Sequence, residues 1–148
     1  MSSVNWGRVI LGGLLAGIMI NMFEFFLNGV VLAKDWEAAI VALGRPPMAG
    51  SQIAVFFIWG FLVWGFLIGI SAVWLYAAIR PRYGAGPKAA LCVGSFVWSL
   101  GYLLPSVTPF LLSLFPRRIF GIGLTVGLVE VLLATLIGAW LYREPDTL

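Results

Sequence analysis

Long apolar runs separated by short polar breaks dominate this sequence. The four runs cover about residues 9–33, 53–79, 89–115 and 119–142. Each is long enough to cross about 30 Å of hydrocarbon as an α-helix, which rises about 1.5 Å per residue. Lipid offers no water to pair with backbone N–H and C=O groups, so a chain that crosses it must pair them internally. The pattern therefore predicts four membrane-spanning helices.

The lengths of the connections predict how these helices are arranged. The breaks at about residues 80–88 and 116–118 are short, which places sequential helices side by side and antiparallel. We expect an all-α fold, an up-down-up-down membrane four-helix bundle that forms one transmembrane domain over residues 1–148.

The first connection, residues 34–52, is longer and has a helical pattern of its own. Asp35 is a plausible N-cap, and Gly44 is placed to end the helix. The large apolar residues between them fall on one helical face: Trp36, Ile40 and Leu43. We predict a short amphipathic helix at the membrane interface over about residues 35–43. A packed loop with a single helical turn is the alternative.

Composition supports the membrane interpretation. Hydrophobic residues make up 61% of the chain, charged residues only 10%, and the mean hydropathy is +1.03. Soluble domains contain about 25% charged residues, and a soluble domain of about 150 residues buries only about 70% of the surface of its unfolded chain. A soluble fold of this size could not hide so much apolar surface, so we expect an integral membrane protein.

The charged residues favour a topological role and no nucleic-acid partner. Nine Lys and Arg against six Asp and Glu give a net charge of +3, and the basic residues lie at segment ends without an aromatic-interleaved basic face. One side of the membrane would carry Arg8, Arg80, Arg82, Lys88 and Arg143, and the other Lys34, Arg45, Arg117 and Arg118. Basic residues favour the cytoplasmic side, so the larger set predicts that both termini are cytoplasmic.

The chain has few groups for chemistry. It contains no histidine and a single cysteine, Cys92, so the usual zinc and haem ligand and the usual general base are missing. We find no enzyme signature and predict no catalytic residue, no metal site and no cofactor.

Tryptophans and prolines indicate where the predicted spans end, which positions are packed and where a helix is distorted. Four tryptophans lie near predicted span ends, where we expect them to act as interfacial anchors: Trp6, Trp36, Trp74 and Trp140. Three others fall deeper and must pack against helices, lipid or a bound apolar molecule: Trp59, Trp64 and Trp98. Pro105 and Pro109 should loosen the third helix, and Ser106 or Thr108 can satisfy the freed carbonyl groups.

Two carboxyl groups inside predicted spans, Glu24 and Glu130, are the candidate site. A charged residue at the centre of a membrane helix costs about 2.5–3.5 kcal/mol on insertion scales. We therefore expect each acid to have a function or a structural partner that offsets this cost. Both lie on helical faces rich in small and polar residues, one formed by Gly13, Gly17, Asn21, Glu24 and Asn28, the other by Gly123, Gly127, Glu130, Ala134 and Gly138. We expect both faces to point into the bundle.

The two acids reach similar depths, nearer the Arg118 side. If the first and fourth helices touch, they can meet directly or share a water or a proton. The site would then be Glu24 and Glu130 with Asn21 and Asn28 beside them. The alternative is that both acids are neutral or paired with those amides and only hold the helices in register.

Three stretches resemble a group of uncharacterised bacterial four-helix membrane proteins. They are NWGRVILGGLLAG at residues 5–17, ALGRPPM at 42–48 and WLYAAIRPR at 74–82. The resemblance implies a multi-pass protein of the bacterial cytoplasmic (inner) membrane and implies no activity.

Three functions remain open. The first is a non-catalytic accessory or structural subunit, partnered by other membrane protein chains or by copies of itself. The second is a small proton- or cation-coupled transporter that uses Glu24 and Glu130. The third is a binder of lipid, quinone or pigment between the second and third helices.

Overall fold

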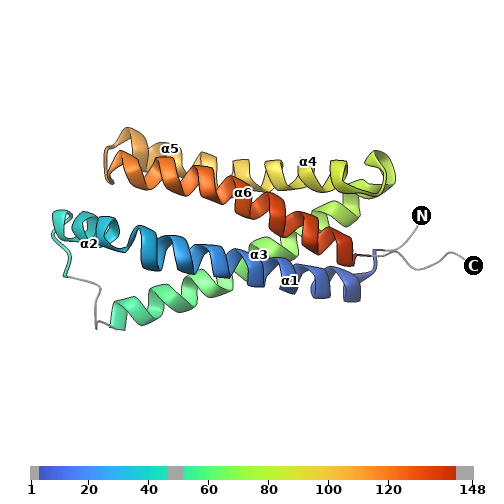
Figure 1. Cartoon of the computed structure of the whole chain (residues 1–148), viewed down its shortest axis with the longest axis horizontal. Helices are drawn as coiled ribbons and strands as arrows, with labels where there is room; N and C mark the ends of the chain where they lie inside the picture. Colours follow the sequence, from blue (N-terminus) through green and yellow to red (C-terminus); the bar gives the residue numbers. More distant parts are fainter. Residues whose placement is uncertain (1–3, 47–51, 143–148) are drawn as a thin grey trace, which may run out of the picture.

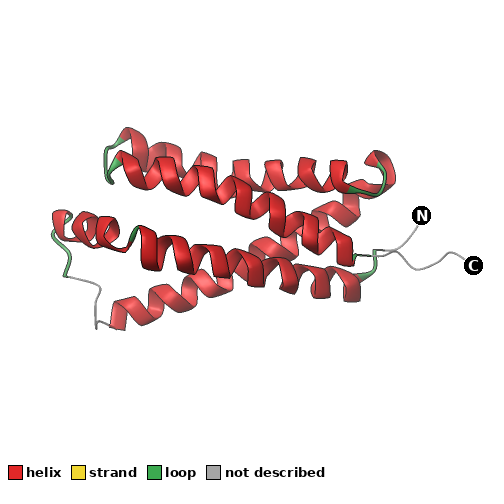
Figure 2. Ribbon diagram, in the orientation of Figure 1, coloured by secondary structure: helices red, strands yellow, loops and turns green. Residues whose placement is uncertain are grey.

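The computed structural model describes residues 4–46 and 52–142, and its helices follow the four apolar runs (Figure 1). Within these residues Figure 2 shows helices and loops and no strand, as the all-α prediction requires. The elements in chain order are α1 (Trp6–Phe26), the π-helix η1 (Leu27–Val31), α2 (Ala33–Ala42), α3 (Gln52–Tyr83), α4 (Pro87–Trp98), the π-helix η2 (Ser99–Leu103), α5 (Leu104–Leu111) and α6 (Arg117–Leu141). Pro47 and Met48 of the ALGRPPM stretch, and the basic residue Arg143, lie outside the described residues.

Four helical stretches are long and apolar enough to cross a membrane. They are Trp6–Val31, Ile58–Tyr83, Pro87–Leu111 and Arg117–Leu141. Many large apolar side chains on these stretches point outward, among them Phe25, Trp59 and Leu111. Such a surface suits lipid and not water, so the chain is a multi-pass integral membrane protein.

The helices pack around α1 and α6. α1 lies against α3 and α6, and α6 also lies against α4. The first residues of α1 and the last residues of α6 are at the same end of the bundle (Figure 1), where the Tyr142 hydroxyl lies 3.4 Å from the Asn5 amide nitrogen. The observed order is the predicted up-down-up-down bundle.

Glycines allow the closest helix contacts. A Cβ added to Gly69 of α3 would lie 2.5 Å from the Gly13 carbonyl oxygen, and one added to Gly12 of α1 would lie 2.6 Å from the Gly138 carbonyl oxygen. The backbones therefore touch where only glycine leaves room. Gly123, predicted to share the packed face of α6, instead faces open space.

The predicted short helix of the first connection exists as α2, but its start differs from the prediction. Asp35 is not the N-cap, because η1 leads almost directly into α2 and Leu32 takes the cap position without a side-chain hydrogen bond. Asp35 lies in the first helical turn, where a carboxylate suits the positive end of the helix dipole, and forms an ion pair of 2.7 Å with Arg118 at the start of α6. Gly44 follows the helix with φ +72°, the conformation expected of a terminating glycine.

Candidate functional site

The bundle brings both intramembrane acids to one place, linked by a tyrosine that the sequence analysis did not single out. Glu130 lies in the middle of α6 and its side chain is 0% exposed, while Glu24, near the end of α1, is half-buried. The Tyr102 hydroxyl donates a hydrogen bond of 2.9 Å to Oε1 of Glu130 and also interacts with the carboxyl group of Glu24. The two acids thus meet through a hydroxyl group.

Further hydrogen bonds extend this contact toward α2. The Asn28 side-chain amide donates to Oε2 of Glu24, and the Trp36 indole N–H donates to Oδ1 of Asn28 over 2.8 Å. We call the set Trp36, Asn28, Glu24, Tyr102 and Glu130 the carboxyl network. It runs from the short helix α2 through the first span to the third and fourth spans.

Both π-helices carry a member of the carboxyl network. Asn28 lies in η1, which closes with an i to i+5 bond from the Leu32 N–H to the Leu27 carbonyl oxygen of 2.8 Å. Tyr102 lies in η2, three residues before Pro105. Single-turn π segments are uncommon and recur at functional sites.

The sequence offers a reason for η2. Pro105 has no N–H to donate to the preceding turn, so the hydrogen-bond register ahead of it is free to widen. The Ser106 hydroxyl donates to the backbone oxygen of Tyr102 over 2.5 Å, which is one residue beyond the Gly101 oxygen that Pro105 leaves without its usual N–H donor. The third helix is loosened at η2, as predicted, whereas the predicted role of Ser106 or Thr108 at a carbonyl group freed by a proline stays a prediction.

Gly127 of α6 makes room for the tyrosine ring. A Cβ at this position would lie 2.9 Å from Cδ1 and 3.1 Å from Cε1 of Tyr102. The ring therefore packs directly on the α6 backbone, one turn before Glu130, and this contact sets where the hydroxyl points.

One oxygen of the network has no partner. Among the described residues, Oε2 of Glu130 is buried without a hydrogen bond. An unsatisfied buried carboxyl oxygen is costly in a low-dielectric interior. Such an atom is suited to hold a proton or to meet a cation.

Asn21, predicted to belong to the same site, lies elsewhere. Its side-chain amide donates to the Leu62 carbonyl oxygen over 3.1 Å, and its side chain lies against Gly65 of α3. The side of α1 that carries Asn21 faces α3, so this amide joins two helices and stays out of the carboxyl network. Glu24, Asn28 and Glu130 are brought together, and Asn21 is not.

The predicted interfacial tryptophans have different surroundings. Trp6 and Trp140 are exposed at the ends of α1 and α6. Trp74 is also exposed, but α3 continues to Tyr83, so Trp74 lies about two and a half turns inside the helix. Trp36 contacts the ring of Phe115 edge-on, with centroids 5.3 Å apart, besides its bond to Asn28.

The three deeper tryptophans divide into two groups. The Trp98 indole N–H donates to the Leu124 carbonyl oxygen over 3.0 Å and so joins α4 to α6. Trp59 and Trp64 are 64% and 52% exposed on α3. Packing within the bundle therefore explains the deep position of Trp98, and it does not explain those of Trp59 and Trp64.

Two members of the carboxyl network, Tyr102 and Trp36, were not predicted as site residues. Tyr102 offered one signal, a hydroxyl group deep in an apolar run, three residues before a proline. Trp36 was predicted only as an anchor, and its bond to Asn28 depends on how η1 turns into α2.

The site has few groups that could bind a metal. Within the described residues no three His, Cys, Asp or Glu side chains cluster as metal ligands. The oxygens of Glu24, Glu130, Tyr102 and Asn28 are hard donors that suit protons or hard cations.

No known family model matches this sequence, and comparisons with curated proteins and with solved structures found no match.

Proposed function

We propose that this protein is a small proton carrier of the membrane in which Glu24 and Glu130 bind a shared proton. The observation that carries the proposal is the fully buried Glu130, which has one oxygen bonded to Tyr102 and the other without a partner among the described residues. The apolar helices around it make two adjacent carboxylates costly. A proton bound at the pair removes one of the two charges.

Counting hydrogens supports a proton at this place. The Tyr102 hydroxyl has one hydrogen, which it donates to Glu130, yet it also interacts with Glu24. A hydroxyl oxygen can accept as well as donate. Protonated Glu24 can therefore donate to Tyr102 while Tyr102 donates to Glu130, and this arrangement needs one proton beyond that of the tyrosine.

The same chain of hydrogen bonds offers a route for the proton to move. If Glu24 gives its proton to the Tyr102 oxygen as Tyr102 gives its own to Glu130, one proton is transferred across the pair without a net change at the tyrosine. Glu24 is half-buried whereas Glu130 is fully buried, so Glu24 is the member from which the proton exchanges with the outside.

Proton flux in liposomes tests the proposal. Purified protein in vesicles with an internal pH dye should collapse an imposed pH gradient, and Glu130→Gln and Glu24→Gln should abolish this activity because glutamine cannot exchange a proton. Glu37→Gln is the matched control, since Glu37 is exposed on α2 outside the network. Infrared spectra should show the C=O band of a protonated carboxyl group in the wild type and lose it in the two site variants. Wild-type protein without flux and without that band would contradict the proposal.

A second candidate, the non-catalytic subunit, is favoured by a different observation. Residues 58–64 of α3, almost two helical turns, are all exposed, among them Ile58, Trp59 and Val63, and Figure 1 shows this end of α3 leaning away from α5 and α6. Such an exposed stretch of α3 suits contact with another membrane protein or with a second copy of this chain. The mass of the detergent-solubilised protein tests this candidate, which requires a stoichiometric complex that Trp59→Ser weakens.

The bacterial cytoplasmic membrane and cytoplasmic termini belong to the proposal as its expected setting. They rest on the resemblance of residues 5–17, 42–48 and 74–82 and on the excess of basic residues on one side. Reporter fusions to either terminus test the orientation.

A further inference from the structure

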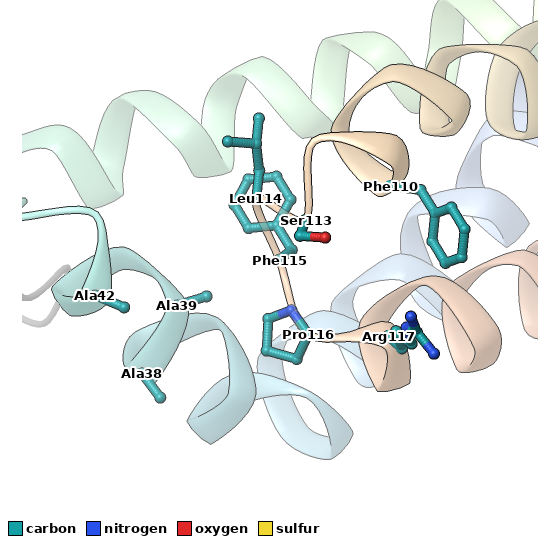
Figure 3. Close-up of a pocket in the computed structure, with 9 residues that line it drawn as sticks. All are labelled: Ala38, Ala39, Ala42, Phe110, Ser113, Leu114, Phe115, Pro116 and Arg117. Carbon is teal, nitrogen blue, oxygen red and sulfur yellow. The ribbon is translucent and has the colours of Figure 1, made fainter.

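A cavity of about 420 Å³ opens between α2 and the connection from α5 to α6 (Figure 3). Its volume is within the range of ligand-binding pockets, about 300–1,000 Å³. Three small residues of α2 form one wall: Ala38, Ala39 and Ala42. The opposite side contains Phe110, Phe115 and Arg117. The cavity thus combines apolar walls with one cationic group.

The cavity lies at the depth of lipid headgroups. The third candidate span ends at Leu111 and the fourth begins at Arg117, so the connection between them marks where hydrocarbon gives way to the polar region. Phe110 is on the hydrocarbon side of this boundary and Arg117 on the polar side. A molecule in the cavity can therefore place an apolar part and a charged part in matching surroundings.

Arg117 is available for an anion, whereas its neighbour is not. Arg118 is paired with Asp35 at 2.7 Å, while Arg117 has no ion-pair partner among the described residues. No acidic residue lines the cavity. A guanidinium group matches the geometry of phosphate, and the absence of an acid within the lining leaves nothing to pair with the cationic end of a zwitterionic headgroup.

We propose that this cavity binds the headgroup of an anionic phospholipid. Arg117 contacts the phosphate, the alanine wall of α2 leaves space for the rest of the headgroup, and an acyl chain leaves along Phe110. This proposal is independent of proton coupling. It also makes the bound lipid a neighbour of the carboxyl network, since Phe115 of the cavity contacts Trp36.

Native mass spectrometry of the protein tests the site with equimolar phosphatidylglycerol and phosphatidylcholine. The wild type should retain phosphatidylglycerol preferentially, and Arg117→Gln should lower that preference about fivefold, the effect of about 1 kcal/mol per basic residue at an anionic surface. Arg45→Gln is the matched control, because Arg45 carries the same charge beyond the end of α2 and does not line the cavity. Its preference should stay at the wild-type value.

A second variant separates the cavity from the charge. Ala42→Leu adds volume to the α2 wall and leaves Arg117 in place, so it should also reduce retained phosphatidylglycerol. Equal losses in Arg117→Gln and Arg45→Gln would overturn the proposal, because they would show a general charge effect. Displacement of the lipid by millimolar inorganic phosphate would overturn it as well, since the site would then recognise a free anion.

Discussion

The substitution Gly127→Ala should disrupt the carboxyl network without removing any of its polar atoms. The added Cβ would lie 2.9 Å from Cδ1 of Tyr102, whereas carbon atoms in contact prefer about 3.5–4.0 Å. The ring must therefore retreat by about 0.6–1.1 Å. The Tyr102 hydroxyl is now 2.9 Å from Oε1 of Glu130, so the same displacement takes the pair to about 3.5 Å or beyond, where a hydrogen bond is lost.

The change in unfolding free energy combines two costs and one gain. Overpacking costs about 1–3 kcal/mol, and a lost interhelical hydrogen bond in a membrane protein costs about 0.6–1.7 kcal/mol. Alanine gains up to about 1 kcal/mol over glycine within a helix. We expect Gly127→Ala to lower the free energy of unfolding by about 1–3 kcal/mol and to reduce proton flux as strongly as Tyr102→Phe.

Gly123→Ala is the control, one turn earlier on the same helix. Nothing lies within 4 Å of the Cβ that it adds, so it should leave flux unchanged and keep or slightly raise stability. Thermal unfolding in detergent, followed by tryptophan fluorescence, gives the stabilities. If Gly127→Ala matched Gly123→Ala in both stability and flux, Tyr102 would not be held against α6 and the account of the network would be wrong.

Three further substitutions test the helix packing of the bundle and the outer end of the carboxyl network. Gly69→Ala should cost about 1–3 kcal/mol or more of unfolding free energy, because its Cβ would lie 2.5 Å from backbone atoms of α1 that cannot retreat singly; Gly60→Ala on the same helix meets nothing within 4 Å and should not destabilise. Thr135→Val should preserve or raise the melting temperature, since it removes a buried hydroxyl without a partner among the described residues and keeps the shape; a clear loss would reveal a hidden bond. Trp36→Phe keeps an aromatic ring beside Phe115 but loses the bond to Asn28, so proton flux should slow while the helix content measured by circular dichroism stays constant.

Much of the fold was predictable because lipid allows a chain few alternatives. An apolar run that must pair its own backbone groups becomes a helix, so the four runs predicted the four spans, and the short breaks predicted their order. Part of the site was predictable for a similar reason. Glu24 and Asn28 are four residues apart, so they remain neighbours along the first span even where it changes from α1 to η1.

The partner of each polar group depended on the tertiary structure. Helical periodicity places Asn21 on the same stripe as Glu24, but α3 lies against that part of α1, so Asn21 bonds to the Leu62 carbonyl instead. Asp35 likewise meets Arg118, 83 residues away, only because α2 packs beside the start of α6. Helical spacing determines which residues share a face, and it does not determine which helix that face meets.

Tyr102, at the centre of the site, also depends partly on the sequence and partly on the tertiary structure. The sequence alone determined that a hydroxyl group lies inside the third apolar run and that Pro105 disturbs the helical turn before it. Only the tertiary structure decided that this hydroxyl reaches two acids on two other helices, because that depends on the widened turn of η2 and on the space that Gly127 leaves. The helices follow from local backbone chemistry in lipid, whereas the carboxyl network follows from the rotation and spacing of helices that are far apart in sequence.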